Sequence, residues 1–175
     1  MKDNEVKLLY KIYKEFYKKE PDFSSENRDN ITIEMQAMAY LLGEYGISLG
    51  DYRFEYNILM YLKMPISMHL QDILVCKMLE HENKEFESDI PLNEMAQNAI
   101  NVIGESVTTE VNKCENQVEA LRLICSVYYV SKSRMSISEM AEIVDFQKCS
   151  PEEVENAMGF VRTMVLDHVN GNPGL

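Results

Sequence analysis

The stretch GDYRFEYNILMYLKMPISMHLQDILVCKMLEHE, Gly50–Glu82, determines how the rest of the chain is interpreted. Its first part, DYRFEYN, alternates aromatic with polar residues, which is the pattern of a strand. After a proline, apolar residues from Ser67 to about Asn83 follow the three- and four-residue spacing of a helix, with Ser67 placed to cap it. The stretch therefore predicts a short hairpin or extended segment near residues 51–62, followed by a helix.

Helical spacing also dominates the chain on both sides of this stretch. Apolar residues recur every three or four positions in four further segments, residues 3–19, 31–44, 92–105 and 115–131. Gly43 and Gly46 lie near the end of the second segment, where glycine relieves the left-handed backbone of a helix C-terminus. The segment 115–131 is apolar over most of its surface, so we expect it to be the central and most buried helix.

Two serine–glutamate pairs mark helix starts in the C-terminal region. Ser136 with Glu139, and Ser150 with Glu153, have the spacing of a capping box, and Pro151 takes the favoured first helical position. They predict helices that end near residues 145 and 168, a pair with the outline of a helix-turn-helix. Acids at the start of the second helix would repel DNA phosphates, so we expect the pair to pack on the domain instead.

These patterns predict a mainly α fold, a single compact domain of six to eight helices. A chain of 175 residues fits one domain, and its 7 glycines and 5 prolines leave few helix breakers. We place the domain at residues 1–168, with an N-terminal amphipathic helix at 1–20 and a polar loop at 21–30. Residues 169–175 are rich in Gly, Pro and Asn and are expected to form a flexible tail.

The charge balance restricts the partners of the protein. The chain has 29 acidic and 17 basic residues, a net charge of -12, which argues against binding to nucleic acid or to anionic membranes. It favours a basic protein partner. We expect no signal peptide, because Lys2, Asp3, Glu5 and Lys7 interrupt any apolar run at the start, and no stretch approaches the length of a membrane span. The four cysteines have no zinc-type spacing, and Cys76 and Cys125 lie in apolar runs where we expect buried thiols, so a reduced, cytoplasmic protein is expected.

Catalytic motifs are missing from the sequence. It contains no P-loop, no GxGxxG and no GxSxG. His69 and Asp72 share a helical face but have no third ligand nearby in sequence, and His81 stands between two glutamates that point elsewhere. The sequence therefore predicts a protein that is not an enzyme and has no cofactor and no metal. A buried polar pocket around His69 or His168 would favour a small enzyme instead.

One face of the N-terminal helix carries lysines at spacings of four and three, Lys7, Lys11, Lys14 and Lys18. Such a row is usually a solvated face, and the alternative is a surface that meets an acidic partner.

A central part and a C-terminal part of the sequence together resemble a known family. The order IEMQAMAYLLGEYGI, DYRFEYN, MPISMHLQDIL, and then ALRLICSVYYVSKSRMSISEMAEIV with CSPEEVENAM, is similar to the YwgA-like bacterial family and more distantly to the Panacea domain of antitoxins. The resemblance covers about residues 31–168. Met64 and Ile66 depart from it, because relatives have a glycine and an aromatic residue in this turn. The resemblance implies a binding module, since Panacea domains resemble neutralising partners of toxins.

The sequence thus predicts a cytoplasmic interaction module, antitoxin-like or regulatory, from a bacterium or phage. It would bind a protein partner through an acidic helical surface, with a homodimer as a further possibility. Two surfaces are candidates, and their residues are Lys63, Met64, Pro65 and Ile66 in one and Glu152, Glu153 and Glu155 in the other. The first is a contact surface only if its apolar residues are exposed.

Two alternatives to this function follow from the same features. An acidic protein from a mobile element could imitate nucleic acid and block a basic groove, which requires a continuous stripe of acids. A transcriptional regulator with a degenerate helix-turn-helix would bind DNA specifically at physiological salt.

Overall fold

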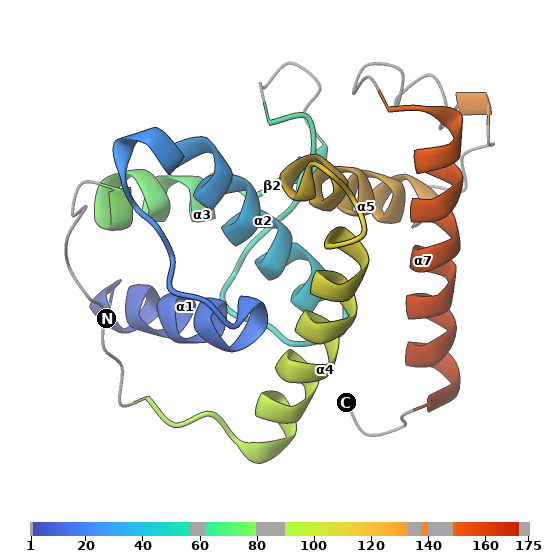
Figure 1. Cartoon of the computed structure of the whole chain (residues 1–175). Coiled ribbons are helices and arrows are strands. Elements are labelled where there is room, and N and C mark those ends of the chain that lie inside the picture. Colours follow the sequence, from blue (N-terminus) through green and yellow to red (C-terminus); the bar gives the residue numbers. More distant parts are fainter. Residues whose placement is uncertain (1, 57–61, 80–89, 133–137, 140–148, 172–175) are drawn as a thin grey trace.

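The computed structural model describes residues 2–56, 62–79, 90–132, 138–139 and 149–171 (Figure 1). The α-helices are α1 Lys2–Tyr17, α2 Arg28–Glu44, α3 Met68–Ile73, α4 Glu94–Val111, α5 Gln117–Lys132 and α7 Pro151–Gly171. A 3-10 turn, η1 Ser25–Asn27, precedes α2, and a π-helical segment, η2 Leu74–Leu79, continues α3. Two short strands, β1 Glu55–Tyr56 and β2 Pro65–Ile66, pair antiparallel. The predicted mainly helical domain with a short hairpin is confirmed.

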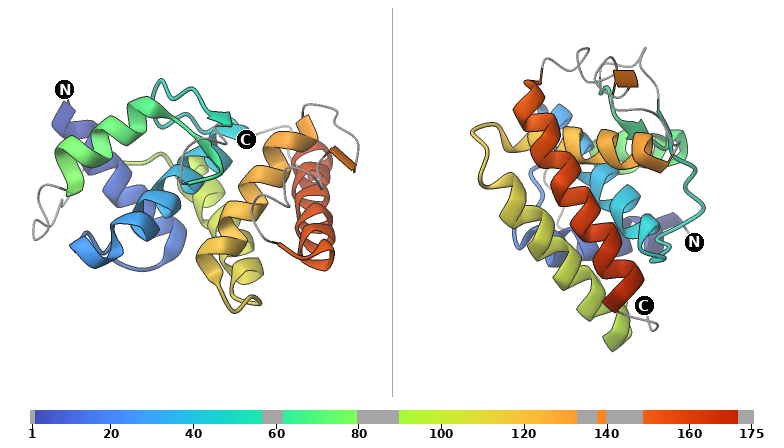
Figure 2. Two further views of the ribbon diagram at one scale, coloured as in Figure 1. Left: turned by 90° about the horizontal axis from the view of Figure 1, so that it is seen from above. Right: turned by 90° about the vertical axis from the view of Figure 1, so that its right-hand side faces the viewer.

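Helix α2 forms the centre of the fold. It packs against α1, α3, α4, α5 and β2 (Figures 1 and 2), and every residue from Ile31 to Leu42 is buried. The prediction that residues 115–131 form the most buried helix was therefore wrong. Helix α5 also packs on the core, but Gln117 at its start and Ser131 and Lys132 at its end are exposed.

Polar side chains inside α2 hid its burial in the sequence. Thr32, Glu34 and Gln36 interrupt the apolar pattern, yet each is buried and hydrogen-bonded. The Thr32 hydroxyl donates to the Arg28 carbonyl over 2.7 Å, and the other two side chains bond to residues of other segments. A buried polar group costs little once its hydrogen bonds are made, so α2 can be enclosed on all sides.

Helices α1 and α4 cross closely beside α2. Leu9, Ile12 and Phe16 of α1 are almost fully buried, and α4 approaches them through Gly104. A Cβ atom at Gly104 would lie 2.4 Å from the Phe16 carbonyl oxygen. The crossing therefore requires glycine at this position of α4.

Helix α7 stands on one flank of the molecule and packs on α5 (Figure 2). Its buried residues, Ala157, Val161 and Met164, are spaced by four and three positions along one face. The predicted capping box at its start is confirmed: the Glu153 N–H donates to the Ser150 hydroxyl and the Ser150 N–H donates to the Glu153 carboxylate.

Several helix boundaries differ from the predicted ones. Helix α4 continues to Val111, which assigns the ambiguous residues 106–111 to it, and α7 continues to Gly171, three residues into the expected tail. Gly46 has a φ of 81° and follows the end of α2, as expected of a glycine that ends a helix. Most of the helix predicted at 136–145 and the rest of the tail lie outside the described residues.

The two cysteines expected to be buried have different environments. Cys125 is buried in α5, but Cys76 is exposed, so that prediction was wrong. Leu70 and Leu74 lie on the side of the α3–η2 segment that faces the core. Cys76, two positions after Leu74, therefore lies on the opposite, exposed side. Among the described residues, no helix is both long and apolar enough to cross a membrane.

Candidate acidic groove

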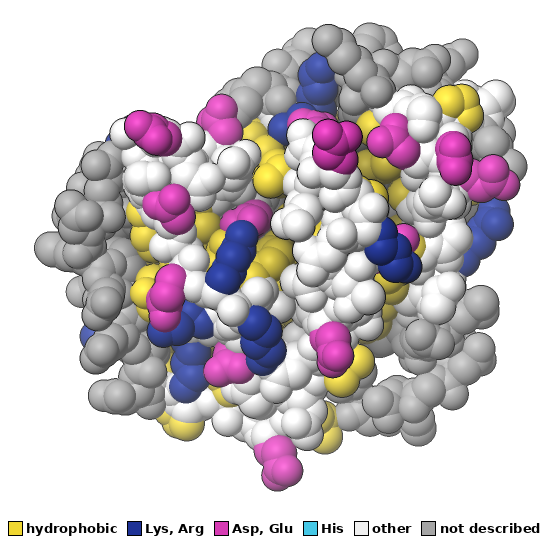
Figure 3. Space-filling model, viewed as in Figure 1, with side chains coloured by type: hydrophobic (Ala, Val, Ile, Leu, Met, Phe, Trp, Pro, Cys, Tyr) yellow, Lys and Arg dark blue, Asp and Glu magenta, His cyan; other side chains and the backbone are white. Residues whose placement is uncertain are grey.

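A groove of about 850 Å³ lies where α4 ends and where α5 and α7 begin. We call it the acidic groove, because five of the described residues in its lining carry carboxylates and, among these described residues, only Lys113 is basic. The carboxylates are those of Glu110, Glu115, Glu119, Glu152 and Glu153. Figure 3 shows acidic side chains recurring at the upper right of the molecule, where α5 and α7 begin.

The floor of the groove is apolar. Leu123, Ile124 and Ala157 are buried, and the half-buried Val118 and Ala120 complete this part of the lining. The arrangement therefore combines an apolar floor with an acidic rim, and three different helices contribute to it.

Local capping signals fix the geometry of the rim. The Glu119 N–H donates to the Asn116 side chain over 3.2 Å, which caps the start of α5. Ser150 and Glu153 cap the start of α7 in the same way. Two helix N-termini therefore meet at the groove, and the acids in their first turns offset the positive ends of the two helix dipoles.

The rim carboxylates are not equally available to a ligand. Glu110 pairs with Lys113 at 2.6 Å, and Glu119 pairs with Arg122 at 3.0 Å. The Ser150 N–H donates to Glu153 and lowers the pKa of that carboxyl. Within the described part of the chain, Glu115 and Glu152 have neither an ion pair nor a side-chain hydrogen bond, and both are exposed. They are the carboxylates that a ligand can reach most easily.

A thiol in the groove reports its negative surroundings. Cys149 is half-buried, and burial together with the carboxylates of Glu153 and Glu119 raises the pKa of its thiol. The raised pKa keeps the thiol neutral, which is the opposite of what a nucleophilic cysteine needs. This part of the groove therefore favours positive charge and not thiolate chemistry.

Two of the three acids predicted as contact residues line this groove. Glu152 and Glu153 belong to its lining, and Glu155 lies on the exposed surface of the same helix outside it. The sequence pointed to these acids through the start of α7. No local pattern in the sequence indicated Glu110, Glu115 and Glu119, because they lie in the end of α4, the following turn and the start of α5, more than 30 positions before Glu152 in the chain.

The other predicted surface is not available for contact. Met64 is 0% exposed, Pro65 and Ile66 are also buried, and Lys63 is half-buried. The sequence predicted a partner contact here only if these apolar side chains are exposed. Their burial removes the reason for that prediction. The reason is that β2 packs between α2 and α5, which turns the apolar side chains of this junction into core.

Three of the four lysines in the predicted row bond to other parts of the chain. Lys11 donates to the Ile90 carbonyl over 2.7 Å, Lys14 pairs with Glu20, and Lys18 donates to the Asn101 side chain over 2.6 Å. These three lysines are therefore engaged with neighbouring segments, whereas Lys7 is exposed and has no side-chain partner among the described residues.

His69 lies at the edge of a shallow hollow lined by Asp51, Arg53 and Glu55. It is exposed, and its Nε2 atom is 3.8 Å from Glu5, whose carboxylate also accepts a 2.8 Å hydrogen bond from Tyr52. The hollow is thus not a buried polar pocket. The side chain of His168 lies outside the described residues. In the described ranges, no three His, Cys, Asp or Glu side chains gather as metal ligands.

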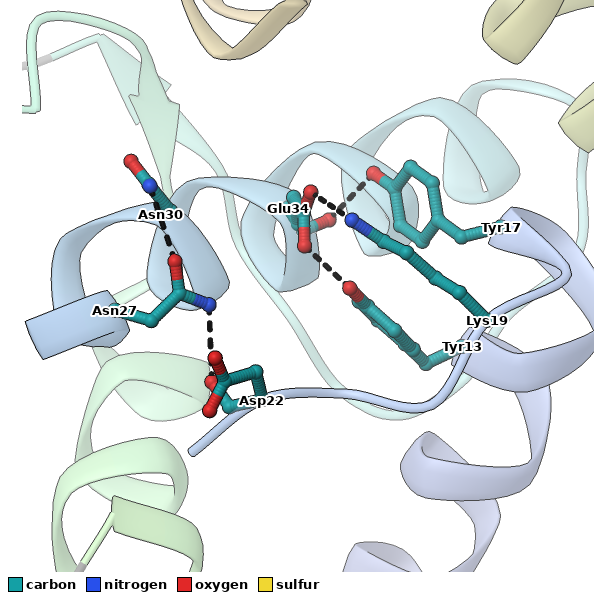
Figure 4. A network of polar contacts seen from close by, with 7 residues as sticks. All are labelled: Tyr13, Tyr17, Lys19, Asp22, Asn27, Asn30 and Glu34. Carbon is teal, nitrogen blue, oxygen red and sulfur yellow. Dashed lines mark hydrogen bonds and ion pairs between the residues drawn. The ribbon is translucent and has the colours of Figure 1, made fainter. Parts of the chain in front are cut away.

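A buried polar cluster that the sequence did not indicate joins α1 to α2 (Figure 4). The Glu34 carboxylate accepts hydrogen bonds from the Tyr13 hydroxyl and from Lys19, whose distance is 2.6 Å, and the Glu34 carbonyl accepts one from Tyr17 over 2.8 Å. Nearby, Asn30 bonds to Asn27, which in turn bonds to the Asp22 carbonyl. All three of these partners of Glu34 belong to α1 or to the residues just after it. The cluster therefore stabilises the packing of α1 against α2.

Comparison of the chain with models of protein families, with curated proteins and with solved structures gave no match.

Proposed function

We propose that the protein is a non-enzymatic interaction module that binds a basic segment of a partner protein in the acidic groove. The observation that carries the proposal is the convergence of five carboxylates, four from three helices and Glu115 from the turn before α5, around an apolar floor. A partner segment with lysine or arginine beside apolar residues matches both features, because the long stems of these side chains cover apolar surface while their charges reach the rim.

The net charge of the chain supports this proposal. An excess of acids speeds the encounter with a basic partner and disfavours acidic competitors. The resemblance to the YwgA-like family and to antitoxin domains points to the same class of function, an antitoxin-like or regulatory module acting in the cytoplasm of a bacterium or on behalf of a phage.

The two alternatives gain no specific support. On the face shown in Figure 3, acids and lysines are interspersed and the acids form no continuous stripe of the kind that nucleic-acid mimicry requires. The start of α7, which a helix-turn-helix would present to DNA, forms part of the acidic rim.

Partner capture with two matched variants tests the proposal. The groove variant carries E115Q and E152Q, and the control variant carries E26Q and E105Q, which are exposed acids outside the groove. Each variant loses two charges. The tagged proteins are incubated with lysate of the native host at two salt concentrations, and bound proteins are quantified by mass spectrometry.

We expect one stoichiometric basic partner to be retained by the wild type and by the control variant and to be lost from the groove variant and at high salt. Equal retention by both variants would contradict the assignment of the groove. Retention of the chain itself as the sole bound species would mean self-association instead.

A further inference from the structure

A second, smaller pocket of about 350 Å³ lies at the other end of α5, and nothing in the proposed function uses it. We call it the aromatic pocket. The end of α2 and the loop that follows form most of its wall, and Tyr129 of α5 closes one side. Its lining residues are Ala39, Tyr40, Gly43, Glu44, Gly46, Ser48, Leu49, Gly50, Tyr52, Phe54 and Tyr129.

The hydroxyl of Tyr40 has no hydrogen-bond partner within the described structure. Tyr40 is 2% exposed, and its oxygen is shielded from solvent. Burial, and then the nearby Glu44 carboxylate, raise the pKa of this phenol, so it stays neutral. An unsatisfied buried hydroxyl is unfavourable, and such groups in native proteins often have a functional explanation.

Aromatic rings surround Tyr40. Its ring centroid lies 5.3 Å from that of Phe54, 6.0 Å from Tyr128 and 6.4 Å from Tyr129. Ring faces of this kind attract organic cations when the cation sits within about 6 Å of a centroid.

A carboxylate completes the pocket. The Glu44 side chain is only 16% exposed and pairs with Lys132 of α5, whose side chain is largely exposed. An exposed lysine is a weakly held partner, because it trades its bond for water at little cost. Another cation can therefore displace Lys132 from Glu44.

We propose that the aromatic pocket binds a small organic cation with N–H donors, of the alkylguanidinium or alkylammonium class. The cation bonds to the Glu44 carboxylate in place of Lys132, lies against Phe54 and Tyr129, and donates an N–H to the Tyr40 oxygen after a small shift of that ring. This proposal does not depend on the acidic groove, since the two pockets share no lining residue.

Calorimetric titration with pentylguanidinium and with pentylurea, its neutral analogue, tests the proposal on the whole protein. We expect the wild type to bind pentylguanidinium at least about tenfold more tightly than pentylurea. E44Q should remove this preference, and Phe54→Leu should weaken binding by roughly three- to tenfold. Lys132→Gln should strengthen binding, because the competing cation is gone, and a variant that merely disturbed the fold would not do so.

Tyr40→Phe separates a binding role from a structural one. It should weaken pentylguanidinium binding several-fold while leaving the urea midpoint of unfolding unchanged or higher, since the unpaired hydroxyl is removed. E105Q, at an exposed acid outside the lining of both pockets, is the control and should bind as the wild type does. Equal binding of the two analogues, no saturation at millimolar pentylguanidinium, or an unaltered affinity in both Tyr40→Phe and Lys132→Gln would overturn the proposal.

Discussion

The side chain of Gln36 and the backbone of Ser67 form two hydrogen bonds with each other in the core. The Ser67 N–H donates to Oε1 of Gln36 over 2.9 Å, and Nε2 of Gln36 donates to the Ser67 carbonyl over 3.1 Å. Gln36 is 0% and Ser67 1% exposed. One amide of α2 thus satisfies both backbone groups at the point where the hairpin leads into α3.

Replacement of Gln36 by leucine should destabilise the protein by about 1–3 kcal/mol, because it leaves the buried N–H of Ser67 unpaired and leaves the Ser67 carbonyl with the Gln71 N–H alone. Urea unfolding followed by circular dichroism measures the change. Gln117→Leu, at the exposed start of α5, is the matched control and should change stability by less than about 0.5 kcal/mol. Equal effects of the two substitutions would show that the hydrogen bonds to Ser67 do not hold the junction in place.

The bond between Tyr13 and Glu34 allows a similar comparison. Tyr13→Phe removes a buried hydrogen bond to a carboxylate and should cost about 1–3 kcal/mol. Tyr10→Phe removes the same kind of bond, from Tyr10 to the exposed carboxylate of Glu20, and should cost less than about 1 kcal/mol. Denaturant unfolding of the two variants distinguishes them. A larger loss in Tyr10→Phe would contradict the role given to burial.

Two glycines in helices should respond to alanine in opposite directions. Gly104→Ala places a methyl group against the Phe16 backbone and should destabilise the protein by about 1–3 kcal/mol despite the helix propensity of alanine. Gly159→Ala meets no atom within 4 Å and should stabilise α7 by about 0.5–1 kcal/mol. Thermal unfolding gives both values, and a stabilising Gly104→Ala would mean that α1 and α4 do not cross so closely.

Alkaline pH should unfold the protein through its buried phenols. Burial raises the pKa of Tyr13 and Tyr40 well above the ordinary value and that of Tyr128 to about 12. The unfolded chain releases these protons near pH 10 and the folded chain does not, so stability is retained below that pH and falls above it.

The loss should approach about 1.4 kcal/mol per pH unit for each phenol that ionises only in the unfolded chain. Urea midpoints at pH 8, 10 and 11 measure it, and absorbance at 295 nm should show a group of tyrosines that ionise together with unfolding. Constant midpoints up to pH 11 would contradict the burial of these hydroxyls.

The sequence predicted the helices well where apolar spacing and caps were clear. The start of α7 is the best example, because Ser150 and Glu153 are a local signal and form the predicted bonds. Burial was predicted less well. Thr32, Glu34 and Gln36 interrupt the apolar pattern of α2. The partners of Glu34 and Gln36 are residues distant in sequence, which no local pattern reveals.

Only part of the candidate groove could be predicted, because local patterns are visible in the sequence and contacts between distant segments are not. Glu152 and Glu153 stand out at a helix start, but the acids opposite them become neighbours only because α7 packs on α5. The junction Lys63–Ile66 shows the converse error. A Met-Pro-Ile run looks like a contact surface in sequence, and strand pairing and packing on α2 convert it to core.

The most direct test of the central claim is an NMR titration of the isotope-labelled protein with the basic amphipathic peptide KLKKLLKK, and with the acidic peptide ELEELLEE as control. We expect saturable amide shifts from the basic peptide that concentrate at the end of α4, the start of α5 and the start of α7, and that vanish in the E115Q and E152Q double variant. Shifts spread evenly over acids on other faces, or undiminished in that variant, would contradict that claim.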